Sequence, residues 1–142
     1  MRICIEIPAT PQHIDEVYQA LASLWERAGS LLVQVVDPQT RICFETALVE
    51  VITNQIRHAY PETGVLGTVQ IELILEDDHV EANLIDHGAA FESNQFLQTQ
   101  PAINVENVAE GGYGLRLATA LLDKIEYARI DNGNLWKLLK IF

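Results

Sequence analysis

Residues 38–60 form the longest helical pattern in the chain, and a helix of this length limits how the rest can fold. Asp37 and Pro38 are typical of a helix start, because an aspartate caps free backbone N–H groups and proline suits the first turn. At about 1.5 Å per residue, the helix would be roughly 34 Å long. One side of it is apolar, with Glu45 and Gln55 as clear polar exceptions, so we expect that side to face the core.

Short segments of alternating or apolar character before and after this helix predict strands. They comprise residues 2–7, 69–76, 80–85, 125–130 and 135–142. Two further helices are predicted, one from Pro11 to a glycine stop at Gly29 and one from Leu115 to about Lys124. Hairpins, including one at the motif DNGN, join most of the strands. We therefore expect one α+β domain over residues 1–142, a two-layer α/β sandwich whose mixed, mostly antiparallel sheet has helices on one face.

The composition excludes several classes of protein. The formal net charge is −11 and the pI about 4.6, and so acidic a surface repels nucleic-acid phosphates and anionic lipids. The longest apolar run, LLVQVV, is far shorter than the roughly 20 residues that span a membrane. Cys4 and Cys43 are the only cysteines, which implies no disulfide framework. We expect a cytoplasmic protein that binds neither nucleic acid nor membrane directly.

On the polar side of the long helix, Glu50, Asn54 and His58 recur at intervals of four residues and fall within about 80° of one another. A solvent-exposed stripe is the simplest interpretation of this helix alone. Such stripes are usually built from lysine and glutamate, however, whereas this one offers a carboxylate, an amide and an imidazole. A carboxylate and an amide oxygen one turn apart can hold Mg²⁺ and direct a nucleophile, so an active site is the alternative.

Two further motifs combine glycine with a possible ligand-binding group. In NLIDHGAAF, Asp86 at a strand end could accept a hydrogen bond from an exocyclic amine, and Gly88 would let the backbone approach a flat ring. The same pair is also ordinary turn chemistry. In EGGYGLRL, Gly111, Gly112 and Gly114 lead into a helix whose first turn has free N–H groups for an anion. A hinge before a core helix is the alternative, and no Walker lysine follows.

Taken in order, these segments resemble the motifs of the GHKL ATPase superfamily, and most closely its small anti-sigma-factor serine kinases with a histidine-kinase-like ATPase domain. The first motif, E-x-x-x-N-x-x-x-H, is matched by Glu50, Asn54 and His58. The second is matched by Asp86, Gly88 and Phe91, and the third by Gly112, Gly114, Leu115, Asp123, Ile125, Glu126 and Tyr127. The resemblance covers nearly the whole chain.

The resemblance implies a Bergerat-type fold with an ATP site and a lid at about residues 92–110. Glu50 would be the catalytic residue, either as the general base or as the carboxylate that orients the attacking hydroxyl, and Asn54 would ligate Mg²⁺. Asp86 would accept a hydrogen bond from the adenine amino group, and Gly88 would clear room for the ring. The other cofactor-binding positions would be His58, Gly112, Gly114 and Leu115.

Two departures from the family pattern bear on turnover. Ala90 replaces the second glycine of the adenine motif and adds a methyl group there. The expected lid contains glutamates but no lysine or arginine, so Mg²⁺, the helix dipole and Arg57 or Arg116 would have to neutralise the phosphates. Weakened affinity or lost turnover is therefore one outcome, although Glu50 and Asn54 are both present.

The resemblance implies an ATP-dependent serine/threonine kinase that phosphorylates a small antagonist (anti-anti-sigma-type) protein and sequesters a sigma factor, and so regulates transcription. The alternative is a catalytically weak, nucleotide-dependent protein-binding module in a partner-switching pathway, and a scaffold without nucleotide is a third class. A homodimer formed through the sheet or the N-terminal segment fits the same resemblance. The partner and the pathway are not encoded in any motif of the chain.

Overall fold

The computed structural model describes residues 1–31, 36–60, 67–91 and 112–142. In chain order the elements are β1 (Arg2–Pro8), a 3₁₀ turn (Pro11–His13), α1 (Ile14–Leu31), α2 (Pro38–Ala59), β2 (Thr68–Leu75), β3 (His79–Asp86), α4 (Gly112–Leu121), β4 (Lys124–Ile130) and β5 (Gly133–Ile141). Each of the three helices and five strands expected from the sequence is present within this set.

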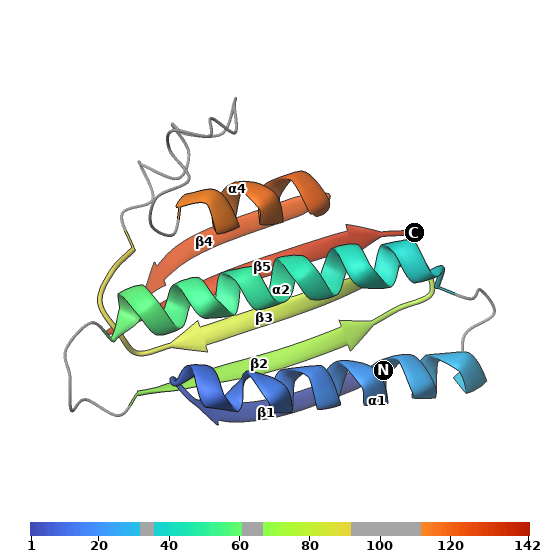
Figure 1. Cartoon of the computed structure of the whole chain (residues 1–142), viewed down its shortest axis with the longest axis horizontal. Coiled ribbons are helices and arrows are strands. Elements are labelled where there is room, and N and C mark those ends of the chain that lie inside the picture. The colour runs from blue at the N-terminus through green and yellow to red at the C-terminus, as the bar shows by residue number, and fades with distance from the viewer. Residues whose placement is uncertain (32–35, 61–66, 92–111) are drawn as a thin grey trace.

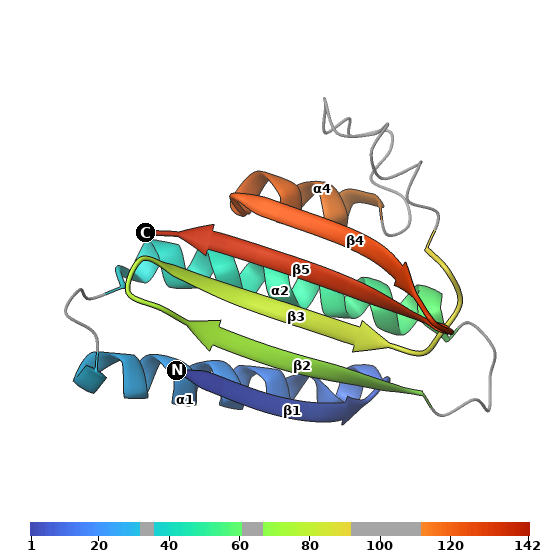
Figure 2. The same cartoon turned by 180° about the vertical axis from the view of Figure 1, so that it is seen from behind.

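The five strands form one sheet in the order β1-β2-β3-β5-β4, and α1, α2 and α4 all lie on the same face of it (Figures 1 and 2). This arrangement confirms the expected two-layer α+β fold. The sheet was expected to be mixed, but in the described residues all four pairs of neighbouring strands are antiparallel. After β3 and α4 the chain forms the edge strand β4, and it then returns as β5, which lies between β3 and β4. The strands β3 and β4 run parallel to each other, but β5 separates them.

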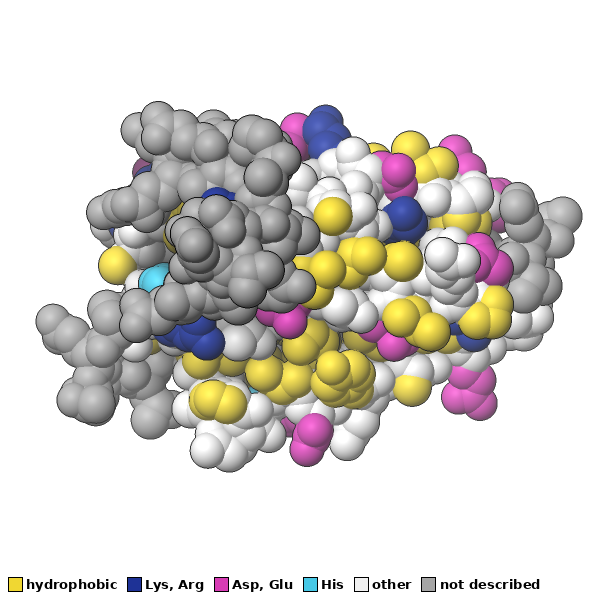
Figure 3. Space-filling view, turned by 45° about the horizontal axis from the view of Figure 1, so that its top comes forward, with side chains coloured by type: hydrophobic (Ala, Val, Ile, Leu, Met, Phe, Trp, Pro, Cys, Tyr) yellow, Lys and Arg dark blue, Asp and Glu magenta, His cyan; other side chains and the backbone are white. Residues whose placement is uncertain are grey.

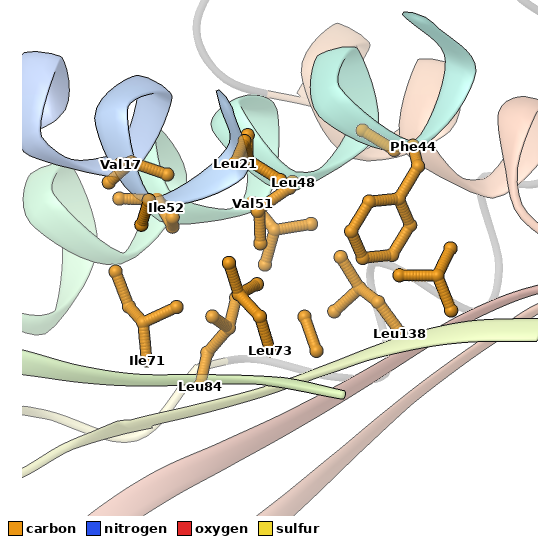
Figure 4. Packing of buried hydrophobic residues seen from close by; sticks show 14 of the residues in the cluster. Val17, Leu21, Phe44, Leu48, Val51, Ile52, Ile71, Leu73, Leu84 and Leu138 are labelled. Carbon is orange, nitrogen blue, oxygen red and sulfur yellow. The ribbon is translucent and has the colours of Figure 1, made fainter. Parts of the chain in front are cut away.

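The core lies between the helices and the sheet, because the apolar side of α2 faces alternate residues of the central strands. Phe44, Leu48 and Val51 of α2 are fully buried above Leu73 of β2 and Leu138 of β5 (Figure 4). The strands were predictable from their alternation, since side chains that point away from the helices are more exposed. This packing fixes α2 over the middle of the sheet, and it therefore fixes the polar stripe along α2.

The start of α2 confirms its predicted cap. The Oδ1 atom of Asp37 accepts a hydrogen bond from the backbone N–H of Thr40 at 3.0 Å, and its Oδ2 atom accepts one from the Thr40 hydroxyl at 2.6 Å. The helix begins at Pro38, where the missing N–H costs no helical bond.

Two predicted helix boundaries were wrong. The helix α1 continues through Gly29 to Leu31, because an exposed glycine costs a helix only about 1 kcal/mol and does not by itself end it. The helix α4 begins at Gly112 and ends at Leu121, three residues before Lys124. Its predicted extension is lost because Lys124 already pairs with Leu139 in the sheet.

The turn between β2 and β3 contains a pH-sensitive contact. Hydrogen bonding to Asp78, together with the charges of Asp78 and Glu81, raises the pKa of His79 above the ordinary value of 6.5. Since the folded-state pKa is the higher one, the stabilisation is fully present below about pH 6.5 and is lost as the pH rises through the folded-state pKa. Urea unfolding of the wild type and His79→Gln should therefore differ more at about pH 5.5 than at about pH 8.5. An equal difference at both pH values would contradict this assignment.

Within the described ranges no helix is long and apolar enough to cross a membrane. The lid expected at about residues 92–110 lies outside the described residues, as does Gly111.

Candidate functional site

The polar stripe of α2 combines side chains with different exposure. Glu50 is half-buried, Asn54 is buried with 5% of its surface exposed, and His58 is exposed. The Oδ1 atom of Asn54 has no hydrogen-bond partner in the described part of the chain. Partial desolvation of the His58 ring, followed by the charge of Arg57, lowers the pKa of His58. The ring lies edge-on to Phe91, with 6.4 Å between the centroids. A buried amide oxygen without a partner is unusual, and it makes Asn54 a candidate for contact with a ligand or a metal ion.

The first and third sequence motifs meet where α2 lies beside the start of α4 (Figures 1 and 2). A Cβ atom built on Gly114 would lie only 2.4 Å from Oε2 of Glu50, so the missing side chain keeps space for this carboxylate. Glu50 is thus placed against the first turn of α4, which begins at Gly112. The side chain of Leu115, in the first turn of α4, is buried in the core, so any contact that this residue makes with a ligand must come from its backbone.

The second motif is built around a fully buried carboxylate, Asp86, at the last position of β3. Its Oδ1 atom accepts hydrogen bonds from the backbone N–H of Gly88 at 2.9 Å and from Nδ2 of Asn134 at 2.8 Å. Its Oδ2 atom accepts one from Nε2 of Gln55 at 2.8 Å. Asp86 is therefore held by donors from α2, from β5 and from its own turn, which fixes its orientation.

The side chains that surround Asp86 are not predictable from the three motifs. Asn134 is Asp86's cross-strand neighbour in β5, and it also donates to the backbone carbonyl of Ala89 at 2.8 Å. Its Oδ1 atom accepts a hydrogen bond from the hydroxyl of Tyr127 and another from Arg129 at 3.3 Å. Tyr127 belongs to the third motif, which predicts no contact with Asp86. The sequence signal for Asn134 is its place in DNGN, a motif that predicts a hairpin turn.

The structure gives a packing reason for a glycine at position 88. A Cβ atom at this position would lie 2.2 Å from the backbone carbonyl oxygen of Ala59, so the space beside Gly88 is occupied by the end of α2. The next residue, Ala89, donates its N–H to the same carbonyl at 2.8 Å. The glycine is needed for this close approach of two backbones, and the clearance expected for a ring stays a prediction. Ala90 is exposed.

Replacing Gly88 with alanine should lower the free energy of unfolding by about 1–3 kcal/mol, since backbone atoms cannot move aside as a flexible side chain would. Gly29→Ala is the matched control. A Cβ atom at Gly29 meets nothing within 4 Å, so that variant should be stabilised by about 0.5–1 kcal/mol. Urea unfolding of both variants measures the contrast, and a change of the same sign in both would contradict it.

An aromatic cluster holds the chain beyond Ala90 against the sheet. The ring of Phe91 lies 5.2 Å from Trp136 and 5.7 Å from Tyr127, and the latter two lie 4.9 Å apart, between centroids. The backbone N–H of Phe91 donates to the Tyr127 hydroxyl at 3.0 Å. The segment that follows Asp86 is therefore anchored at both of its described ends.

The charges on the helical face do not form a basic patch in the view of Figure 3, where lysine and arginine side chains are scattered among acidic and apolar ones. Within the described residues, no group of three or more His, Cys, Asp or Glu side chains could hold a metal ion. A metal at this site would need ligands from a bound substrate in addition to Asn54, which is the usual way in which Mg²⁺ binds with phosphates.

The sequence pattern of the histidine kinase-like ATPase domain family matches residues 7–140, so the chain belongs to this family. The resemblance seen in the three motifs is thereby confirmed. The fold agrees as well: the chain is similar to the structure of the RsbU and RsbW domains of Rv1364c from Mycobacterium tuberculosis, with a TM-score of 0.67 and 20% identity. That match covers 99% of this chain and 32% of the other. The catalytic domain of the histidine kinase ThkA matches with a TM-score of 0.56 and 14% identity, over 98% and 97% of the two chains.

Relatives of similar sequence are named as serine-protein kinases. The serine-protein kinase RsbW of Oceanobacillus iheyensis is 29% identical over 126 residues, which span 86% of this chain and 75% of the relative. The serine-protein kinase RsbW of Bacillus subtilis is 28% identical over 132 residues, which span 90% and 76%. These matches support the branch that the motifs indicated.

Proposed function

We propose that this protein is an ATP-dependent serine/threonine kinase of the anti-sigma-factor type. One observation carries the proposal most directly: the carboxylate of Glu50 lies against the first turn of α4, at Gly114. The N-terminal turn of a helix is where free N–H groups and the helix dipole favour phosphate. A carboxylate at the same place can reach the hydroxyl that attacks a terminal phosphate, and the names of the sequence relatives point to the same chemistry.

The proposed nucleotide contacts follow the three motifs. Asp86 would accept a hydrogen bond from the adenine amino group, while Gly112, Gly114 and Leu115 would donate backbone N–H groups to the phosphates. Asn54 would bind Mg²⁺ through Oδ1, the buried amide oxygen that has no partner in the described residues. His58 would close the outer end of the stripe, and Gly88 would hold the Asp86 turn against α2.

The proposed reaction is an in-line transfer in which Glu50 acts as the base. The oxygen of a serine hydroxyl forms a bond to the γ-phosphorus, the bond between that phosphorus and the β,γ-bridging oxygen breaks, and ADP leaves. Glu50 orients the hydroxyl and accepts its proton. Mg²⁺, when bound with the nucleotide, neutralises charge on the phosphates. The N–H groups at the start of α4 stabilise the charge that remains.

The proposed partners are a small antagonist protein that carries the serine and a sigma factor that is sequestered. Phosphorylation adds about 1.5–2 negative charges. The chain already carries a formal charge of −11, so the phosphorylated antagonist should be repelled and released. The sheet face opposite the helices offers a surface for a second copy in a homodimer, with a groove of about 440 Å³ whose lining includes Glu6, Glu72 and Ile85.

A nucleotide-dependent binding module without turnover is the second candidate function, because Ala90 stands where the family motif has glycine.

A thermal-shift titration tests nucleotide binding. A ligand that binds only the native state adds about 2.7 kcal/mol when its free concentration is about 100 times Kd, so ATP with Mg²⁺ should raise the melting temperature by several degrees. Asn54→Ala should lose most of the extra shift that Mg²⁺ provides, whereas Asn83→Ala, a change of the same residue type on the opposite sheet face, should keep it. No shift at millimolar nucleotide, with the protein folded, would overturn the proposal.

A further inference from the structure

Gln55 is a polar residue on the apolar side of α2 with only 2% of its surface exposed. Its Nε2 atom donates to Oδ2 of Asp86 at 2.8 Å, while its Oε1 atom has no partner in the described part of the chain. The other polar exception on that side, Glu45, has a structural explanation, because it accepts a hydrogen bond from Nε1 of Trp25 at 2.6 Å. Burying an amide with one end unpaired destabilises a fold, so Gln55 is poorly explained by packing alone.

The hydrogen bonds of Asp86 leave one acceptor position open. A carboxylate has two oxygens and about four lone-pair sites. Gly88 and Asn134 use both sites of Oδ1, whereas Gln55 uses one of the two on Oδ2. Among the described residues, the carboxylate therefore has a single unused lone pair, on Oδ2. Asp86 is fully buried, where a hydrogen bond to it is stronger and an unpaired acceptor more costly than in water.

We propose that Gln55 is a positioning residue that makes this site select nucleotides whose base carries an exocyclic amine. The inference rests on the proposed function, in which Asp86 contacts the base. Gln55 holds Oδ2 so that only one acceptor is available, and an amine satisfies it. A keto oxygen at the same ring position would place two acceptors in contact. The side-chain amide of Gln55 cannot flip, because its Oε1 atom would then face Oδ2 of Asp86.

The first test compares three nucleotides in calorimetric titrations with Mg²⁺: ATP, purine riboside triphosphate, which lacks the amine, and inosine triphosphate, which carries a keto oxygen. The wild type should bind ATP about ten- to a hundredfold more tightly than purine riboside triphosphate, the range for a hydrogen bond to a charged group. Gln55→Met keeps the length of the side chain but removes the donor. It should reduce this ratio to within about threefold, mainly through weaker binding of ATP.

Glu45→Met is the matched control on the same helix. It also removes one hydrogen bond from the apolar side of α2, but from Trp25 rather than from Asp86, and it should keep the wild-type ratio. A ratio that Gln55→Met leaves unchanged would overturn the inference, and so would an equal loss of affinity for ATP and purine riboside triphosphate, which indicates a structural role only. A wild type that binds none of the three nucleotides would instead overturn the proposed function.

A double variant that reverses the donor and the acceptor tests the same inference, and this test does not depend on Gln55→Met being folded. Combining Gln55→Glu with Asp86→Asn keeps a hydrogen bond between positions 55 and 86 but exchanges donor and acceptor. The introduced amide at position 86 can keep its oxygen toward Gly88 and Asn134 and present an N–H to the base. The double variant should then prefer inosine triphosphate to ATP by about tenfold. A retained preference for ATP would contradict the positioning role of Gln55.

Discussion

Replacing Glu50 with alanine is expected to slow phosphoryl transfer by about 10²–10⁴-fold, the usual effect of losing a positioned base. The affinity for ATP with Mg²⁺ should not fall. The carboxylate lies against the first turn of α4, at Gly114, where the phosphates would bind, so removing its charge relieves repulsion. Single-turnover transfer of labelled phosphate to an antagonist protein measures the rate, and calorimetry measures the affinity.

The control for this experiment is Glu76→Ala, which removes an exposed carboxylate at the far turn between β2 and β3. Its transfer rate should equal that of the wild type. If Glu50→Ala and the wild type transfer phosphate at the same rate, Glu50 is not the catalytic base. If neither transfers phosphate but both bind ATP, the binding module becomes the better account of this protein.

Replacing Asp86 with alanine is expected to weaken both the fold and ATP binding. The change leaves buried donors of Gln55 and Asn134, and the half-buried N–H of Gly88, without their acceptor. Each unsatisfied buried donor costs about 1–3 kcal/mol, so the free energy of unfolding should fall by about 3 kcal/mol or more. Loss of the hydrogen bond to the adenine amine should weaken ATP binding by about ten- to a hundredfold.

Asp77→Ala serves as the control for Asp86→Ala, because Asp77 is exposed in the turn between β2 and β3. Both the stability and the ATP affinity of this control should stay close to the wild-type values. Urea unfolding and calorimetry at a temperature where every variant is folded separate the two effects. A folded Asp86→Ala protein with wild-type ATP affinity would show that the base binds elsewhere.

The elements of the fold were predictable because each has a local pattern. The cap at Asp37, the helical spacing of Phe44, Leu48 and Val51, and the alternation in β2 all lie within a few residues of the structure that they determine. The order of the strands was not local. Nothing in the hairpin at Asn132 indicates that β5 lies between β3 and β4, which depends on the crossover through α4.

The candidate site was predictable only in its motif residues. The surroundings of Asp86 depend on contacts between distant parts of the chain: Gln55 is 31 residues away and Asn134 is 48 residues away. The register of β3 with β5 places Asn134 opposite Asp86, and no pattern in either strand specifies it. The same reason explains Gly88, whose constraint comes from the carbonyl group of Ala59 at the end of α2.

The most direct test of the central claim, that the three motifs form one ATP site, is hydrogen–deuterium exchange with and without ATP and Mg²⁺. Exchange should slow in three separate segments: residues 50–58 of α2, the turn from Asp86 to Phe91, and the first turn of α4. It should not change in the turn between β2 and β3, which lies at the other end of the sheet from Asp86 (Figure 1). Unchanged exchange in those three segments at saturating nucleotide, or slower exchange confined to other parts of the chain, would contradict the account.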